Sequence, residues 1–184
     1  MKNIYIVRHC EAEGQSPPAP LTEKGVVQAQ ELADFLEDVQ VDYIVSSPFE
    51  RALQTIQPFA GRRNMEVVED MRLSERVLSS NPMSDWAEKL EATYQDLNLK
   101  FEGGESSSDA MKRIVSVVED ICESDSENAV IVAHGGILTL LLYFYTPHFS
   151  FDRWEGMSNP DVYLLKRSEG KNEVKRIWEE GMSF

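Results

Sequence analysis

The stretch NAVIVAHGGILTLLLYFY, residues 128–145, decides the class of fold that this sequence predicts. Its first part, Ala129 to Ala133, is the clearest strand of the chain, a short apolar run with β-branched residues. His134 and two glycines follow, and an apolar helix is predicted from Ile137 to Tyr145. A strand that passes directly into a helix is typical of α/β proteins, in which strands and helices alternate.

The same alternation of strand and helix continues toward the N-terminus. Two apolar runs that each stop at polar residues predict buried strands, and a weaker run predicts a third. A helix is expected after each of the first two strands, and Thr22 is placed to cap the first helix. The predicted strands are Lys2 to Val7, Val41 to Val45 and Met65 to Val68, and the predicted helices end near Asp38 and Ala60.

Further helices and a hairpin complete the pattern. Ser106 and Asp109 have the spacing of a capping box, which opens a helix that ends near Cys122. The sequence therefore predicts an α/β fold, a three-layer sandwich with a largely parallel central sheet and helices on both faces. The other predicted elements are a long irregular loop from Arg72 to Asp85, a helix from Trp86 to Leu97 and a hairpin of Asp161 to Arg167 and Glu173 to Trp178.

Length and composition restrict the domain organisation and the partners. A chain of 184 residues, 42% hydrophobic and 27% charged, suits one soluble domain that spans residues 1–184. The net charge of -14 and the pI near 4.6 make nucleic acid and anionic membranes poor partners, although a local cluster of Arg and His can still bind a small anion. Two distant cysteines and the lack of a long apolar run favour a cytoplasmic location.

Several residues that can bind an anion follow the predicted strands. Arg8 and His9 end the first strand, and Arg51 opens the helix after the second. His134 follows the strand at residues 129–133. Because open α/β sheets bind ligands beyond the carboxyl ends of their strands, these side chains are expected to meet at one edge. Two guanidinium groups, two imidazoles and the amides of a helix N-terminus suit a tetrahedral dianion, so phosphate is the expected ligand.

These residues lie in six short segments that resemble the motifs of the histidine phosphatase (phosphoglycerate mutase-like) superfamily, in the order of that family. The resemblance runs from residue 4 to about residue 142. One RH dipeptide is weak evidence, whereas six ordered segments are strong. The segments are IVRHCEAEG at 6–14, LTEKG at 21–25, SSPFERALQT at 46–55, RLSE at 72–75, GGES at 103–106 and AVIVAHGG at 129–136.

The resemblance implies a role for each matched residue. His9 would be the nucleophile that attacks phosphorus in line and becomes a phosphohistidine. Glu75 fits the position of the general acid that protonates the leaving oxygen and then, as a base, activates water. No metal and no cofactor are implied, because fixed cations stabilise the charge. The implied phosphate ligands are the side chains of Arg8, Arg51 and His134, the side chains of Gln15, where the family commonly has Asn, and Ser16, and the backbone amide of Gly135.

The resemblance implies a metal-independent phosphomonoester hydrolase that acts on a small soluble phosphorylated metabolite. Whether its specificity is narrow or broad stays open at this point. One rival is a cofactor-dependent phosphoglycerate mutase, which returns the phosphoryl group to another hydroxyl and is usually a longer chain. Another is a catalytically silent phosphate- or phosphoprotein-binding module. The pairing of a nucleophile with an acid argues against the silent module, because recognition alone needs neither.

Ordinary structural roles are the alternative to these functions. His9, Arg51 and His134 could each be ordinary residues at the ends of strands and helices, and only their motifs favour catalysis. Glu75 could belong to an ordinary acidic loop. A metal site built from the three histidines, with His148 as the third, is disfavoured because two arginines in the same pocket repel a cation.

Two positions depart from the pattern of the family. Cys10 stands where the family usually has Gly, and we expect it to be a small buried hydrophobic residue rather than an oxidation-sensitive thiol. The loop after Glu75, with the sequence RVLSSNPMSDW, replaces a stretch that contains Gly and Trp and would border the leaving group.

Overall fold

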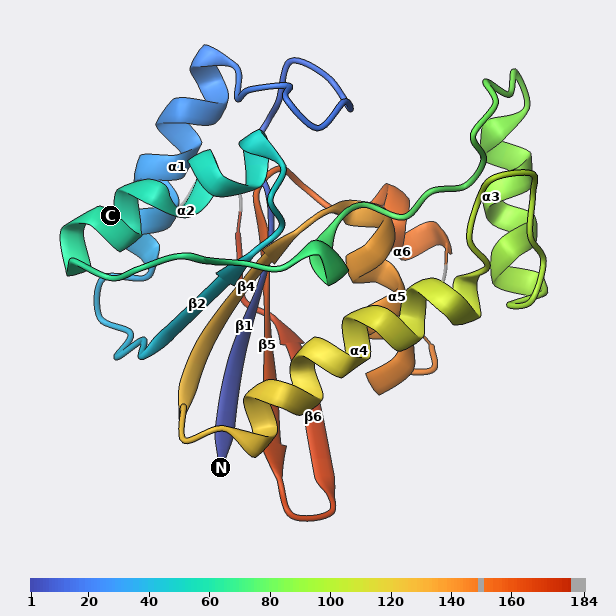
Figure 1. Ribbon diagram of the computed structural model, residues 1–184. Helices are drawn as coiled ribbons and strands as arrows, with labels where there is room; N and C mark the ends of the chain where they lie inside the picture. The colour runs from blue at the N-terminus through green and yellow to red at the C-terminus, as the bar shows by residue number, and fades with distance from the viewer. Residues whose placement is uncertain (149–150, 180–184) are drawn as a thin grey trace.

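The structure, a computed structural model, describes residues 1–148 and 151–179. Its six strands form one sheet in the order β3-β2-β4-β1-β5-β6 (Figure 1). The two strands that carry the clearest sequence motifs, β1 and β4, therefore lie side by side in the middle. The strands are β1 Lys2–Arg8, β2 Tyr43–Ser46, β3 Val68–Glu69, β4 Asn128–Ala133, β5 Asp161–Ser168 and β6 Lys171–Arg176.

The sheet is largely parallel, as the sequence predicts. β4 pairs in parallel with both β1 and β2, and β2 pairs in parallel with β3. The exception is β5, which is antiparallel to its neighbours β1 and β6. β5 and β6 are the predicted terminal hairpin, and its turn contains Gly170 with a φ of 74°, a conformation that glycine adopts without strain.

Helices cover both faces of the sheet, which confirms the predicted three layers (Figure 1). α1 and α2 pack together on one face, and α4 and α5 pack together on the other. The helices are α1 Glu23–Phe35, α2 Glu50–Arg63, α3 Trp86–Gln95, α4 Ser107–Glu123, α5 Gly135–Tyr145 and the short α6 Phe151–Glu155, with a 3₁₀ turn η1 at Met71–Leu73. None of the described helices is long and apolar enough to cross a membrane.

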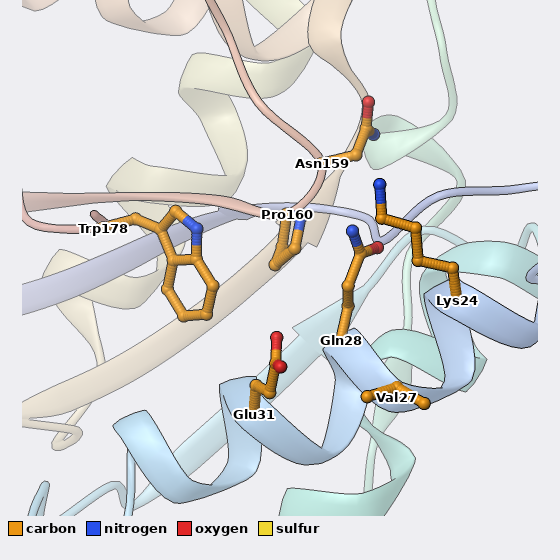
Figure 2. A pocket seen from close by; sticks show the side chains of 7 residues that line it. All are labelled: Lys24, Val27, Gln28, Glu31, Asn159, Pro160 and Trp178. Carbon is orange, nitrogen blue, oxygen red and sulfur yellow. The ribbon is translucent and has the colours of Figure 1, made fainter. Parts of the chain in front are cut away.

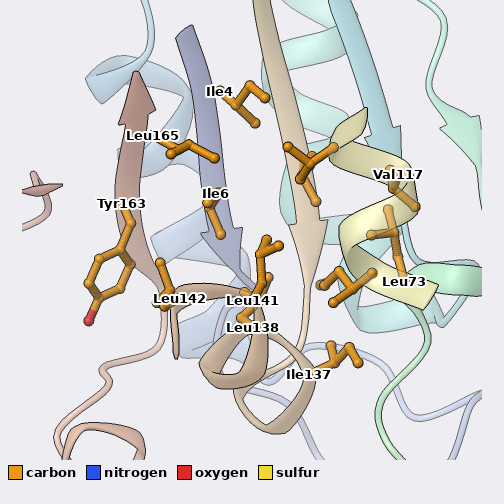
Figure 3. Packing of buried hydrophobic residues seen from close by; sticks show 14 of the residues in the cluster. Ile4, Ile6, Leu73, Val117, Ile137, Leu138, Leu141, Leu142, Tyr163 and Leu165 are labelled. Atoms are coloured by element: carbon orange, nitrogen blue, oxygen red, sulfur yellow. The ribbon is translucent and has the colours of Figure 1, made fainter. Parts of the chain in front are cut away.

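The central strands bury side chains on both faces. On β1, Ile4 and Ile6 face the layer of α4 and α5, and Figure 3 shows both in the cluster that also contains Leu141, while Val7 faces α1 and α2. Each such side chain contributes about 1.5–3 kcal/mol when it is fully buried. Strands that are covered on both sides need apolar residues at every position, which is why they are recognisable in the sequence as continuous apolar runs.

Most predicted elements agree with the structure to within a few residues, and three differ from it at their ends. α5 begins at Gly135 rather than Ile137, because His134 is its N-cap and both glycines form its first turn. α2 continues past Ala60 to Arg63, and its C-cap is Asn64, whose φ of 50° is left-handed. β3 is only two residues long and pairs with Val45 and Ser46 of β2, so it overlaps the predicted strand Met65 to Val68 at Val68 alone.

Candidate active site

Three parallel strands bring their final residues to one edge of the sheet. β2, β4 and β1 are neighbours, and Arg8 is level with Ala133 in the register of β1 and β4. The backbone of His9 continues this pairing, since its N–H donates to the Ala133 carbonyl at 3.0 Å. The backbone of Ser47 continues the pairing of β2 with β4 in the same way, since its N–H donates to the Val132 carbonyl at 2.9 Å. The segments around His9, Ser47 and His134 therefore leave the sheet together.

The contacts of His9 leave one of its ring nitrogens unprotonated. Its Nδ1 lies 2.7 Å from the carbonyl oxygen of Cys10, which can only accept, so Nδ1 carries the proton. Nε2 is then the unprotonated nitrogen, and it accepts a hydrogen bond of 3.2 Å from Arg51 Nε. The ring is only 5% exposed. This arrangement fixes both the tautomer and the direction of the lone pair.

The neutral form of His9 persists into acid. Burial lowers its pKa from the usual 6.5 to about 4, and although the hydrogen bond to Cys10 opposes this change, the Arg51 and Arg8 cations lower the pKa further. A neutral imidazole is the form that can attack phosphorus. The His9 ring is therefore neutral at neutral pH and remains so down to about pH 4.

The lowered pKa predicts that the free energy of unfolding falls as the pH drops from about 6.5 to about 4. In that window only the unfolded chain takes up the proton, so stability rises with pH there and is lost toward acid. His9 contributes about 3 kcal/mol of this change. Urea unfolding of wild type and His9→Gln at several pH values measures it. The variant should lose less stability than wild type between pH 6.5 and 4, and equal losses would contradict the prediction.

Arg51 is a fully buried cation in the first turn of α2. Besides its bond to His9, it donates from Nη1 to the Ser16 carbonyl at 2.9 Å, and it lies 5.1 Å from the ring centroid of Phe49. Its Nη2 is buried and has no hydrogen-bond partner among the described residues. Burial lowers the pKa of Arg51 and the Glu75 carboxylate opposes this, so the two groups interact across the site.

Arg8 contributes a second guanidinium at the end of β1. Its Nη1 donates to the Met157 carbonyl at 2.8 Å, while Nε is buried without a partner in the described part of the chain. Burial lowers its pKa, and Glu75 and Asp161 oppose that change. A Cβ at Gly135 would come within 3.1 Å of this guanidinium, so glycine is what allows α5 to approach Arg8 closely.

His134, which directly follows β4, is the second imidazole of the site. Its Nε2 lies 2.8 Å from Ser47 Oγ, and its ring centroid is 5.2 Å from that of His9. Nδ1 is buried and unpartnered among the described residues, and it is a donor in the tautomer in which Ser47 donates to Nε2. Burial lowers the pKa of His134 well below its usual value, and positive charge on His9, Arg51 and Arg8 acts in the same direction.

Three unpartnered polar nitrogens therefore gather around His9, namely the donors Arg8 Nε and Arg51 Nη2, and His134 Nδ1. A buried donor without an acceptor costs about 1–3 kcal/mol, so such a cluster is unfavourable unless it serves a ligand. An oxyanion that accepts several hydrogen bonds and carries negative charge suits this set of donors. The arrangement favours a phosphoryl group that lies opposite His9 Nε2.

Glu75 lies at the N-terminus of α5, immediately beside these groups. Its carboxylate accepts from the amides of Gly136 at 3.0 Å and of Ile137 at 2.8 Å. The amide of Arg76 donates to it as well, at 2.8 Å. The predicted acid thus shares the helix end with the predicted phosphate ligands. Gly135, the predicted amide donor, has no acceptor for its N–H among the described residues.

Two of the predicted ligands have exposed side chains. Gln15 is exposed and its side chain forms no hydrogen bond within the described residues, so its binding role stays a prediction. Ser16 is also exposed; its carbonyl accepts from Arg51, and the binding role of its hydroxyl stays a prediction. The chain turns outward at residues 15–18, which directs these side chains to solvent.

Sequence patterns did not single out Ser47 and Arg76. Ser47 follows β2 directly, and the SSP motif was the available signal for its bond to His134. Arg76 is only 8% exposed, and its Nη1 donates to Thr93 and Ser107 at 3.3 Å. Arg76 thus places a further buried cation next to Glu75. No feature of its sequence surroundings distinguishes Arg76 from a surface arginine.

The structure also bears on the two alternatives that involve Cys10 and His148. Burial raises the pKa of the Cys10 thiol to about 12, and its side chain is fully buried, which supports a packing role over a reactive thiolate. His148 is exposed and lies beyond the C-terminal end of α5, whereas His134 caps the N-terminal end. A metal site shared by the three histidines is therefore contradicted.

The family comparison covers nearly the whole chain. Residues 4–180 match the model of the histidine phosphatase superfamily, branch 1. A putative phosphoserine phosphatase 2 of Hydrogenobacter thermophilus is 32% identical over 162 residues, 79% of each chain. A probable phosphoglycerate mutase of Erwinia tasmaniensis is 31% identical over 160 residues, 77% of this chain and 74% of the relative.

Solved structures share the fold. The mycobacterial glucosyl-3-phosphoglycerate phosphatase, solved with inorganic phosphate, matches with a TM-score of 0.78 at 24% identity and covers 97% of this chain and 96% of its own. An Escherichia coli protein described as a putative alpha-ribazole-5'-P phosphatase matches with the same TM-score of 0.78 at 20% identity. The order and direction of the strands are thus those of a known architecture.

Proposed function

This chain belongs to the histidine phosphatase superfamily, and from that premise we propose that it hydrolyses small phosphomonoesters through a phosphohistidine on His9. Relatives named as phosphatases support phosphatase activity in this chain. The observation that carries the mechanism is the state of the His9 ring. Its Nδ1 is bonded to a carbonyl, its Nε2 is the unprotonated nitrogen and accepts a hydrogen bond from Arg51, and unpartnered polar nitrogens lie around it.

In the first half-reaction, the Nε2 lone pair attacks phosphorus and the bond between phosphorus and the ester oxygen breaks. The leaving oxygen takes a proton from Glu75 and departs as an alcohol. In the second half-reaction, Glu75 removes a proton from water, and the resulting oxygen attacks phosphorus. The P–N bond then breaks, its electron pair returns to Nε2, and inorganic phosphate leaves.

The cations act on the charge that grows on the nonbridging oxygens. Arg8 and Arg51 are held in place by backbone carbonyls, so they need little rearrangement when the charge develops. His134 adds a neutral donor from Nδ1. Because Arg51 also contacts Nε2, the same residue can align the nucleophile and bind the oxygens it attacks.

Glu75 must turn from the amides of Gly136 and Ile137 to reach a leaving oxygen. A phosphoryl group at the N-terminus of α5 would compete for those amides and release it. Glu75→Gln tests the acid role, because an amide accepts hydrogen bonds but supplies no acidic proton. The variant should lose about 10²–10⁴-fold in kcat on phosphoserine.

In kcat/KM, which reports the phosphorylation half-reaction, the same variant should lose far less on para-nitrophenyl phosphate, whose phenolate leaves without a proton. Steady-state kinetics with both substrates measure the difference. If Glu75→Gln slows both substrates equally in the phosphorylation half-reaction, Glu75 is not the general acid.

Phosphoserine is the first substrate to examine, because two relatives are named as phosphoserine phosphatases. A panel that adds 3-phosphoglycerate, a sugar phosphate and a nucleotide measures the breadth. We also propose a cytoplasmic location, on the ground that Cys10 and Cys122 are both free thiols.

One assay separates the three functions considered. We expect turnover of para-nitrophenyl phosphate by the purified chain with EDTA present. Absence of turnover by well-folded protein would favour a phosphate-binding module. A mutase remains a candidate because this chain is similar to a probable phosphoglycerate mutase. A mutase would instead interconvert phosphoglycerates and depend on 2,3-bisphosphoglycerate.

A further inference from the structure

The turn that carries the nucleophile is fixed by side chains from three other elements. After His9, the N–H of Cys10 donates to Thr55 Oγ1 of α2 at 2.9 Å. The N–H of Glu11 donates to Gln28 Oε1 of α1 at 2.9 Å. The carbonyl of His9 itself accepts from Asn159 Nδ2 at 2.8 Å. Each of these contacts joins the turn to a residue distant in sequence.

Asn159 differs from the other two because it contacts the nucleophilic residue directly. It lies in the segment before β5, which also holds the neighbouring cation, since the Met157 carbonyl accepts from Arg8 at 2.8 Å. That segment is anchored in turn by Asp161, which is fully buried and accepts from the Ser158 amide at 3.2 Å. A single anchored segment thus holds the backbone of His9 and the guanidinium of Arg8.

We propose that Asn159 is a positioning residue that holds the His9 carbonyl and thereby aims Nε2 at phosphorus. The inference rests on the proposed phosphatase function. His9 Nδ1 is bonded to the Cys10 carbonyl, which belongs to the peptide between Cys10 and Glu11. The Asn159 bond holds the oxygen of the preceding peptide, between His9 and Cys10, which links the Cα of His9 to that of Cys10. Without the Asn159 bond, the peptide between His9 and Cys10 can rotate, and the Cys10 carbonyl that orients the ring moves with it.

The effect should fall on the rate rather than on binding. Arg8, Arg51 and His134 bind the phosphoryl oxygens and do not contact Asn159 through the bonds described above. A misplacement of about 1 Å at a reacting atom can cost about 10²-fold in rate. Loss of the Asn159 bond should therefore slow phosphorylation of His9 while phosphate affinity changes little.

The surroundings of Asn159 tolerate substitution. It lines a hollow of about 300 Å³ that also borders α1 and the indole of Trp178. Figure 2 shows Asn159 and Pro160 across this hollow from Lys24 and Gln28. A side chain of similar size at position 159 meets open space on one side, so the variants are expected to fold.

The test uses Asn159→Asp and Asn159→Leu, which keep the size of the side chain and remove the donor. In Asn159→Asp the new carboxylate also repels the His9 carbonyl. We expect kcat to fall about ten- to a hundredfold in both variants. The dissociation constant for inorganic phosphate should stay within about threefold of wild type, since its ligands are unchanged.

Val27→Asp is the matched control, because it introduces a carboxylate at the same hollow from an exposed position, 57% exposed, that holds no part of the turn. It should retain wild-type kcat. Unchanged kcat in both Asn159 variants would overturn the inference. Equal losses in kcat and in phosphate affinity would also overturn it, because they would show that the whole site, and not only the His9 ring, is displaced. An inactive wild-type chain would instead contradict the proposed function itself.

Discussion

His9→Ala is expected to lose at least about 10⁴-fold in kcat/KM and to form no phosphoenzyme. The reason is that His9 Nε2 is the unprotonated nitrogen of a ring whose tautomer the Cys10 carbonyl fixes, and it contacts Arg51, a proposed ligand of the phosphoryl oxygens. The nearest imidazole, His134, is instead bonded through Nε2 to Ser47. The measurement is steady-state hydrolysis of phosphoserine and para-nitrophenyl phosphate, with circular dichroism to verify the fold.

His9→Gln serves as the control for size, because the glutamine fills the same buried place without a nucleophilic nitrogen. Both variants should be equally inactive. Activity above about one hundredth of wild type in either folded variant would mean that another group attacks phosphorus, and the assignment of His9 would be wrong.

Arg51→Met is expected to reduce the rate of phosphoenzyme formation by about 10²–10³-fold, the usual loss when one donor to a developing charge is removed. The same change should leave the free energy of unfolding unchanged or higher. Arg51 is fully buried and no carboxylate of the described residues lies within ion-pair distance of it. Replacing such a charge with an apolar side chain of similar length removes its desolvation cost.

Rapid-quench kinetics and urea unfolding measure the two effects separately. Arg51→Lys should fall between wild type and Arg51→Met, because it keeps the charge but not the planar fork that meets both His9 and the phosphoryl oxygens. Destabilisation together with near-normal catalysis in Arg51→Met would show that Arg51 supports the fold and not the reaction.

The sequence predicted the parts of the site that short motifs encode. A strand covered on both faces is a continuous apolar run, so β1 and β4 were predictable, and with them the place where Arg8, His9 and His134 leave the sheet. The resemblance identified from six segments is confirmed by the family match over residues 4–180.

The contacts that orient the site could not be predicted in this way. Asn159 reaches the His9 carbonyl across 150 positions of sequence, and its surroundings contain no pattern that marks it. Likewise, Glu75 was placed by its motif, but its bonds to the first turn of α5 depend on how η1 packs against α4 and α5. Pairings of this kind arise from tertiary packing, which periodicity and capping rules do not describe.

The most direct test is to mix the enzyme with substrate, quench it within milliseconds and identify the phosphorylated atom. We predict an alkali-stable, acid-labile phosphoryl group on His9, attached to Nε2, because Nδ1 is committed to the Cys10 carbonyl. Mass spectrometry of the peptide locates the residue, and phosphorus NMR distinguishes the two ring isomers. A phosphoryl group on Nδ1 or on another residue, or turnover without any phosphoenzyme, would contradict the account.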